Sequence, residues 1–177
     1  CFQTIYGIKT LKLNPFKGLF KKNECSGFEE LNLDDLCNRL NYKFKDKRLL
    51  CQALKHRSYL TYSGECRTAS NERLELLGDS VLGLVVTEFL FIKFPKETEG
   101  ILTNYKSLLV SGRLLAEIAK DFDLGRFLLL NESEARTGGR KRRSLLADAV
   151  EAIIGAIYLD GGLLPAKKFI QDNVTWR

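Results

Sequence analysis

Acidic residues placed at helical intervals inside two apolar stretches constrain this chain more than any other feature of its sequence. The stretches cover residues 71–80 and 146–152. Their acids are Glu72, Glu75 and Asp79 in the first, and Asp148 and Glu151 in the second. Because residues three, four and seven positions apart share a helix face, each stretch is expected to form a helix with its acids along one side.

Carboxylates beside a core need compensation, because they are rarely buried unless they are paired or bind a metal. The second stretch contains no Lys or Arg one turn from its acids. Oxygen ligands from two crossing helices suit a divalent cation. The alternative is that these acids form solvated helix faces or ordinary salt bridges, in which Arg73 pairs with a neighbouring acid.

If these acids bind divalent cations, the chemistry that they favour is hydrolysis of phosphodiesters. Two ions about 4 Å apart can stabilise both the attacking and the leaving oxygen of an in-line displacement. Asp79 and Asp148 have short side chains and would hold a metal closely. Glu75 and Glu151 reach farther and could bridge a metal and its water.

Apolar periodicity favours helices along most of the chain, and no segment shows sustained strand-like alternation. The clearest helices are expected from Ser70 or Asn71 to about Lys93, and over residues 144–159. Further helix starts are expected at Asp46, Thr103, Ser111 and Asn131, a final helix over residues 163–174, and a loop over residues 60–69. The sequence therefore predicts an all-α domain at residues 29–177, after a basic N-terminal extension at residues 1–28.

Net charge, hydrophobic content and cysteine usage limit the kinds of protein and partner that the sequence fits. The 177 residues carry a net charge of +6 and are 45% hydrophobic, which fits a globular protein with an anionic partner such as nucleic acid. The five cysteines include no CxxC pair, so free thiols in a reducing, cytoplasmic compartment are expected rather than disulfides or zinc. No apolar run is long enough to span a membrane. Because the chain contains no Met, we expect it to be part of a longer protein.

Basic residues supply candidate phosphate contacts. Residues 139–143 include Arg140, Lys141 and Arg142, which either bind phosphates or form an exposed solubilising loop. Lys106, near a helix start, is a further candidate. The single histidine, His56, is interpreted as structural, because no serine has the glycine-flanked elbow of a hydrolase triad.

The two acidic stretches closely resemble motifs of the ribonuclease III family. Residues 71–80 (NERLELLGDS) look like its signature motif, and residues 148–162 (DAVEAIIGAIYLDGG) look like its second acidic motif. Residues 56–59 (HRSY) and 99–100 (EG) also match in kind and order. The resemblance covers roughly residues 30–175.

The resemblance implies an all-α endonuclease domain that acts as a homodimer on double-stranded RNA, in rRNA or mRNA processing. Products would carry 5′-phosphate and 3′-hydroxyl ends with short 3′ overhangs. The cofactor would be Mg²⁺, for which Mn²⁺ can substitute. The matched positions comprise the metal ligands Glu75, Asp79, Asp148 and Glu151, the catalytic acids Asp79 and Glu151, and Glu72 near the dimer interface and active-site valley.

Two departures accompany the resemblance. Leu76 stands where the family usually has a Phe that packs against the partner protomer, so the tightness of the dimer is in question. Bacterial members usually continue into a double-stranded-RNA-binding domain, whereas this chain stops at Arg177. The alternative function is a catalytically silent ribonuclease-III-like RNA-binding protein. A helical protein-interaction module would explain the fold but not the paired acidic motifs.

Overall fold

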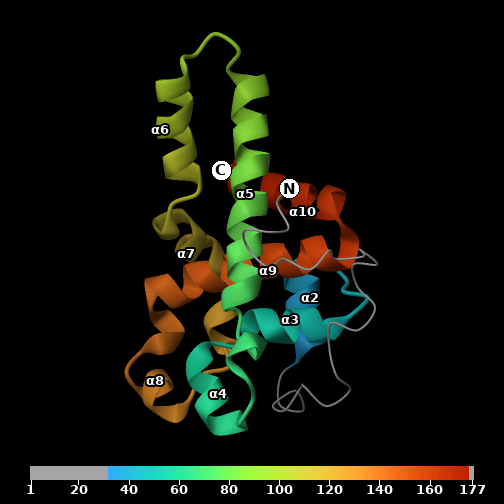
Figure 1. The fold of residues 1–177 in the computed structure, drawn as a ribbon, viewed down its shortest axis with the longest axis vertical. Helices are drawn as coiled ribbons and strands as arrows, with labels where there is room; N and C mark the ends of the chain where they lie inside the picture. Colours follow the sequence, from blue (N-terminus) through green and yellow to red (C-terminus); the bar gives the residue numbers. More distant parts are fainter. Residues whose placement is uncertain (1–31, 176–177) are drawn as a thin grey trace, which may run out of the picture.

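Two long helices, α5 (Glu72–Lys93) and α9 (Arg143–Gly161), cross at the centre of the molecule. The computed structural model describes residues 32–175, and within this range the fold is all-helical, as the sequence predicts (Figure 1). One isolated β-bridge, between Lys55 and Leu129, is the exception among these residues. The predicted extension at residues 1–28 lies outside the described residues.

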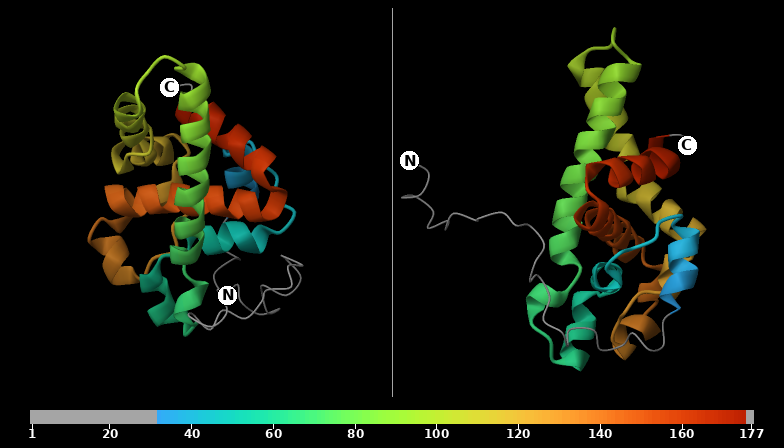
Figure 2. Two further views of the ribbon diagram at one scale, coloured as in Figure 1. Left: turned by 45° about the horizontal axis from the view of Figure 1, so that its top comes forward. Right: turned by 90° about the vertical axis from the view of Figure 1, so that its right-hand side faces the viewer.

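Shorter elements surround this crossing. The α-helices are α2 (Leu33–Arg39), α3 (Lys47–Leu54), α4 (Arg57–Ser63), α6 (Glu99–Leu109), α7 (Gly112–Asp121), α8 (Glu132–Arg136) and α10 (Leu163–Ile170). The single turns are η1 (Arg67–Ala69), η2 (Leu124–Arg126), η3 (Gly139–Lys141) and the π-helical η4 (Gln171–Thr175). Helices α5 and α6 run side by side as a hairpin that extends beyond the other helices (Figures 1 and 2).

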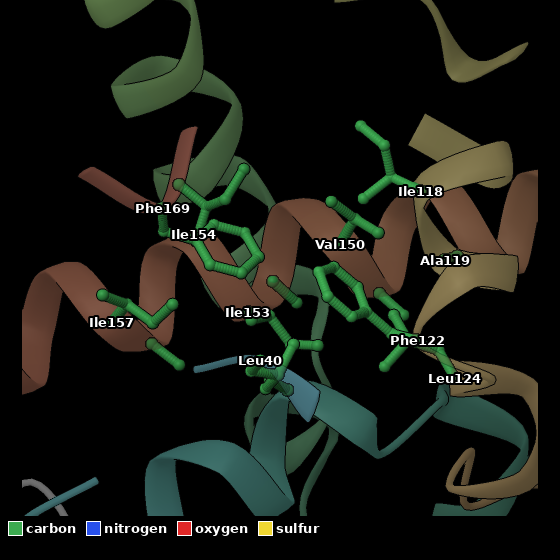
Figure 3. Close-up of a cluster of buried hydrophobic side chains, with 14 of the residues drawn as sticks. Leu40, Ile118, Ala119, Phe122, Leu124, Val150, Ile153, Ile154, Ile157 and Phe169 are labelled. Carbon is green, nitrogen blue, oxygen red and sulfur yellow. The ribbon is translucent and has the colours of Figure 1, made fainter. Parts of the chain in front are cut away.

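Helix α9 forms the centre of the core, because it is apolar on nearly all sides and packs against α3, α5, α7 and α10. Figure 3 shows Val150 and Ile153 of α9 among side chains from α7 and other elements. The rings of Phe122 and Phe169 stack with their centroids 5.9 Å apart, which joins the end of α7 to α10. A core of this kind fixes α9 and therefore fixes the acids that it carries.

Side-chain caps start several helices where the sequence predicts them. Asp46 accepts a hydrogen bond from the backbone N–H of Arg48, and Ser111 accepts one from Leu114. Asn131 caps α8 in the same way. Asn71 precedes α5 as expected, but its side chain makes no capping hydrogen bond.

Two predicted boundaries are wrong. Helix α6 begins at Glu99, one turn before the predicted start at Thr103, because Glu99 suits the positive end of a helix. Thr103 instead donates its hydroxyl to the Glu99 carboxylate over 2.8 Å. The loop predicted over residues 60–69 is helical as far as Ser63, since α4 buries Leu60 and is capped by His56, and the single turn η1 occupies residues 67–69.

Candidate metal centre

Two glycines allow α5 and α9 to touch backbone to backbone. A Cβ atom added at Gly78 would lie 1.7 Å from the carbonyl oxygen of Glu151. One added at Gly155 would lie 2.3 Å from the carbonyl oxygen of Leu74. Because no side chain fits between the helices at this crossing, the acids of the two motifs are brought to the same place.

Three of the predicted ligands converge there. Carboxylate oxygens of Glu75, Asp148 and Glu151 all lie within 4.8 Å of one another. All three side chains are half-buried. Asp79 lies outside this group and is exposed one turn beyond Glu75. The structure therefore assembles three of the four acids that the sequence singles out as metal ligands.

The three carboxylates repel one another. Burial raises the pKa of each one, and neighbouring acids raise it further for Glu75 and Glu151. The pKa of Glu151 reaches about 7. Asp79 contributes to this effect, since its charge raises the pKa of both Glu75 and Glu151. At neutral pH the group therefore has a strong affinity for positive charge.

A cleft of about 910 Å³ opens beside the group, with Glu75 and Asp148 in its lining. Three other carboxylates line the same cleft, and each of them has a cationic partner. These pairs are Glu65 with Lys55, Glu72 with Arg67, and Glu134 with Arg142. Within residues 32–175, no ion pair joins Glu75, Asp148 or Glu151 to a lysine or arginine.

This contrast tests whether the residues suit a metal. Glu65, Glu72 and Glu134 each have a cationic partner, whereas Glu75, Asp148 and Glu151 have no such ion pair within the described residues. Their donors are carboxylate oxygens, which hard divalent cations prefer. The chemistry of the donor set therefore fits a divalent cation held between α5 and α9.

The predicted RNA-contacting cations do not form one surface. Nη1 of Arg140 donates to the carbonyls of Gly125, Arg126 and Leu128 over 2.9, 3.2 and 2.9 Å, so this arginine braces the η2 turn. Arg142 faces the cleft and Lys141 is exposed outside it. Lys106 is half-buried against α5, with its Nζ 3.6 Å from where a Gly83 Cβ would lie.

Two cations in the cleft lining, Arg57 and Arg67, were not anticipated from the sequence. Arg57 follows His56 directly, so its place in the HRSY segment could have indicated it. His56, interpreted from the sequence as structural, caps α4 because its Nδ1 accepts the Ser58 backbone N–H over 3.2 Å, and it also lines the cleft. Burial lowers the pKa of His56, which keeps that nitrogen free to accept.

No helix in the described part of the chain has both the length and the apolar character needed to cross a bilayer.

Fold and site together define a class of protein: a helical domain that gathers unpaired carboxylates beside an arginine-lined cleft. The sequence profile of the "Ribonuclease-III-like" family matches residues 46–176. The chain therefore belongs to the ribonuclease-III-like family, as its motifs suggest.

Individual relatives support the same family assignment. The chain is 48% identical over 143 residues to Ribonuclease 3 of Legionella pneumophila, covering 80% of this chain and 60% of the relative. It is 50% identical over 139 residues to Ribonuclease 3 of Colwellia psychrerythraea, covering 78% and 50%. The chain thus spans half to three fifths of the length of these curated relatives.

A solved structure has the same fold as this chain. The nuclease domain of ribonuclease III from Campylobacter jejuni superposes with a TM-score of 0.73 at 44% identity, covering 81% of this chain and 99% of that one. That structure is described as flexible in a region involved in dimer formation.

Proposed function

We propose that this chain is the catalytic domain of a Mg²⁺-dependent endonuclease that cleaves double-stranded RNA. The observation that supports this most is the convergence of Glu75, Asp148 and Glu151, unpaired, beside a cleft whose other acids are neutralised. Proteins named Ribonuclease 3 at about half identity support the same class of reaction. Precursors of ribosomal and messenger RNA are the proposed substrates, and a cytoplasmic site is proposed because the five cysteines of the sequence include no CxxC pair.

Each acidic residue has a proposed role that follows from its position. Glu75, Asp148 and Glu151 would hold the cation at the helix crossing, with Asp79 at its exposed edge. A bound Mg²⁺ would supply Lewis acidity at the phosphate and a water of lowered pKa. Burial and neighbouring acids raise the pKa of Glu151 to about 7, so its carboxyl group is suited to exchange a proton near neutral pH. Attack by water at phosphorus with cleavage of the P–O3′ bond would release the 3′-oxygen as a hydroxyl group and leave the phosphate on the 5′ end of the other fragment.

Double-stranded RNA is the substrate that fits a cleft with cations along its walls. Arg57, Arg67 and Arg142 line it, and arginine is suited to phosphate oxygens. Lys141 and Arg140 extend basic character beyond the cleft. Duplex RNA is recognised mainly through its shape and its phosphates, so base-specific contacts are not required.

A second copy of the chain is the proposed partner. Leu76, Leu84 and Phe91 occupy one face of α5 and are 72, 58 and 71% exposed, and Leu108 of α6 is 68% exposed. An exposed apolar surface of this kind on a helical hairpin marks an interaction site. Two copies joined there would carry two carboxylate centres, one for each RNA strand, which fits short 3′ overhangs.

The proposed activity is tested with long duplex RNA in Mg²⁺ at low salt. We expect limit products bearing 5′-phosphates, no cleavage when EDTA replaces Mg²⁺, and little cleavage of a single strand of the same sequence. Gel analysis with end-labelled RNA measures all three. Duplex RNA that is bound in a gel-shift assay but stays intact at high protein concentration would favour the catalytically silent alternative.

A further inference from the structure

The side chain of Lys55 is buried at the edge of the cleft, with 2% of its surface exposed. A buried ammonium group is costly unless it is paired. Its Nζ lies 2.6 and 2.8 Å from the two carboxylate oxygens of Glu65, whose side chain is 13% exposed. The Ser63 hydroxyl donates to the same carboxylate over 2.7 Å. Glu65 lines the cleft, so the charge of its carboxylate belongs to the cleft wall.

The backbone of the same lysine is tied to the metal-binding helix. The Lys55 carbonyl accepts the Asn71 N–H over 2.8 Å, and the Asn71 carbonyl accepts the Glu75 N–H over 2.9 Å. On either side of Lys55, the Leu54 carbonyl and the His56 N–H both bond to Leu129. These backbone hydrogen bonds fix the position of Lys55. Its side chain therefore determines where the Glu65 carboxylate lies.

A purely structural role does not account well for such a pair. Replacing a buried ion pair with apolar residues is often neutral or stabilising. Glu65 is also the one carboxylate of the cleft lining whose cation is nearly inaccessible to solvent, whereas Arg67 and Arg142, which pair with Glu72 and Glu134, are 77 and 44% exposed. Those arginines can turn toward a phosphate, but Lys55 cannot leave Glu65.

We propose that Lys55 sets the RNA affinity of the cleft by permanently neutralising Glu65 in its wall. The inference rests on the proposed function, because it takes duplex RNA as the ligand of this cleft. Lys55 and Glu65 touch neither metal nor reacting phosphate in this account. They are positioning residues that act on binding, through charge, and leave the carboxylate centre as it is.

Three substitutions separate charge from packing. Lys55→Met leaves Glu65 negative in the wall and is expected to weaken duplex binding on the order of tenfold, as one uncompensated charge near a phosphate would. Glu65→Gln leaves the ammonium group and should bind RNA as well as the wild type or more tightly. The double variant removes both charges and should return to wild-type affinity.

The measurement is the dissociation constant for a short duplex RNA by fluorescence anisotropy, without metal and at low salt, on proteins shown by circular dichroism to be folded. Lys168→Met, which removes the α10 lysine of an exposed ion pair with Asp172 of η4, is the matched control and should change little. In cleavage assays, Lys55→Met should raise KM and leave kcat nearly unchanged. If Lys55→Met does not fold, the comparison of Glu65→Gln with the double variant still reports the sign of the effect.

Equal affinities for all folded variants, or weakening by both Lys55→Met and Glu65→Gln, would overturn the inference while leaving the proposed function intact. Wild-type protein that neither binds nor cleaves duplex RNA would overturn the proposed function, and the inference with it.

Discussion

Replacing Gly78 with alanine is expected to destabilise the domain by about 3 kcal/mol or more. The added Cβ would meet the Glu151 carbonyl oxygen at 1.7 Å and the Gly155 backbone nitrogen at 2.9 Å. Both obstacles are backbone atoms of α9, so no side chain can rotate out of the way. The helices would have to separate, which would open the core around α9 and move Glu151 away from Glu75. Urea denaturation measures the free energy of unfolding directly.

Gly100 provides the matched control. It lies in α6, and a Cβ added there would meet no atom within 4 Å. Gly100→Ala should therefore stabilise the protein slightly, by about 0.5–1 kcal/mol, through the higher helix propensity of alanine. If Gly78→Ala unfolds at the same urea concentration as the wild type, the close crossing of α5 and α9 is contradicted.

Replacing Glu151 with glutamine is expected to have opposite effects on stability and on function. Glutamine keeps the shape of the side chain but cannot serve as an anionic ligand or exchange a proton. Cleavage of duplex RNA should fall by about a hundredfold or more. In EDTA, the same variant should be more stable than the wild type above neutral pH, because it removes a charge that is disfavoured by burial and by the neighbouring acids Asp79, Glu75 and Asp148.

The pH dependence of this difference follows from the raised pKa of Glu151. The group ionises at an ordinary value of 4.5 and at about 7 in the folded protein. The folded state therefore holds this proton more tightly, and the stability present below pH 4.5 is lost as the pH rises to about 7. Because the side chain is only half-buried, solvent screening reduces the effect to about 1–2 kcal/mol.

Thermal unfolding in EDTA at pH 5 and at pH 8 checks the prediction. The variant should exceed the wild type in stability at pH 8, and the gap should narrow at pH 5. Glu97→Gln, at an exposed position before α6, is the control and should show no such change. If the difference in stability between variant and wild type is the same at both pH values, the raised pKa of Glu151 is contradicted.

The central part of this structure could be predicted from local patterns. The three- and four-residue spacing of acids in apolar stretches predicts both α5 and α9 and the face on which their carboxylates lie. What brings Glu75 to Asp148 and Glu151 is the contact between Gly78 and Gly155, which depends on tertiary packing and leaves no local signal. The departure of Asp79 from the group has the same origin, since the distance between helices decides which acids converge.

Other parts could not be predicted from local patterns. Arg140 stands in a basic run that suggests phosphate binding, yet its guanidinium bonds to the carbonyls of Gly125 and Arg126 in the η2 turn, which are remote in sequence. The partnership of Lys55 with Glu65 depends on the burial of a lysine, which composition does not indicate. The missed helix at residues 57–63 depends on a histidine cap, which is less common than caps by Ser, Asp or Asn.

The most direct test of the account is an anomalous difference map from crystals of this chain soaked in Mn²⁺. We predict a peak at the crossing of α5 and α9, about 2–2.5 Å from carboxylate oxygens of Glu75, Asp148 and Glu151, and no such peak in crystals of Glu151→Gln. A map with these three side chains ordered and close together but no ion between them would contradict the account.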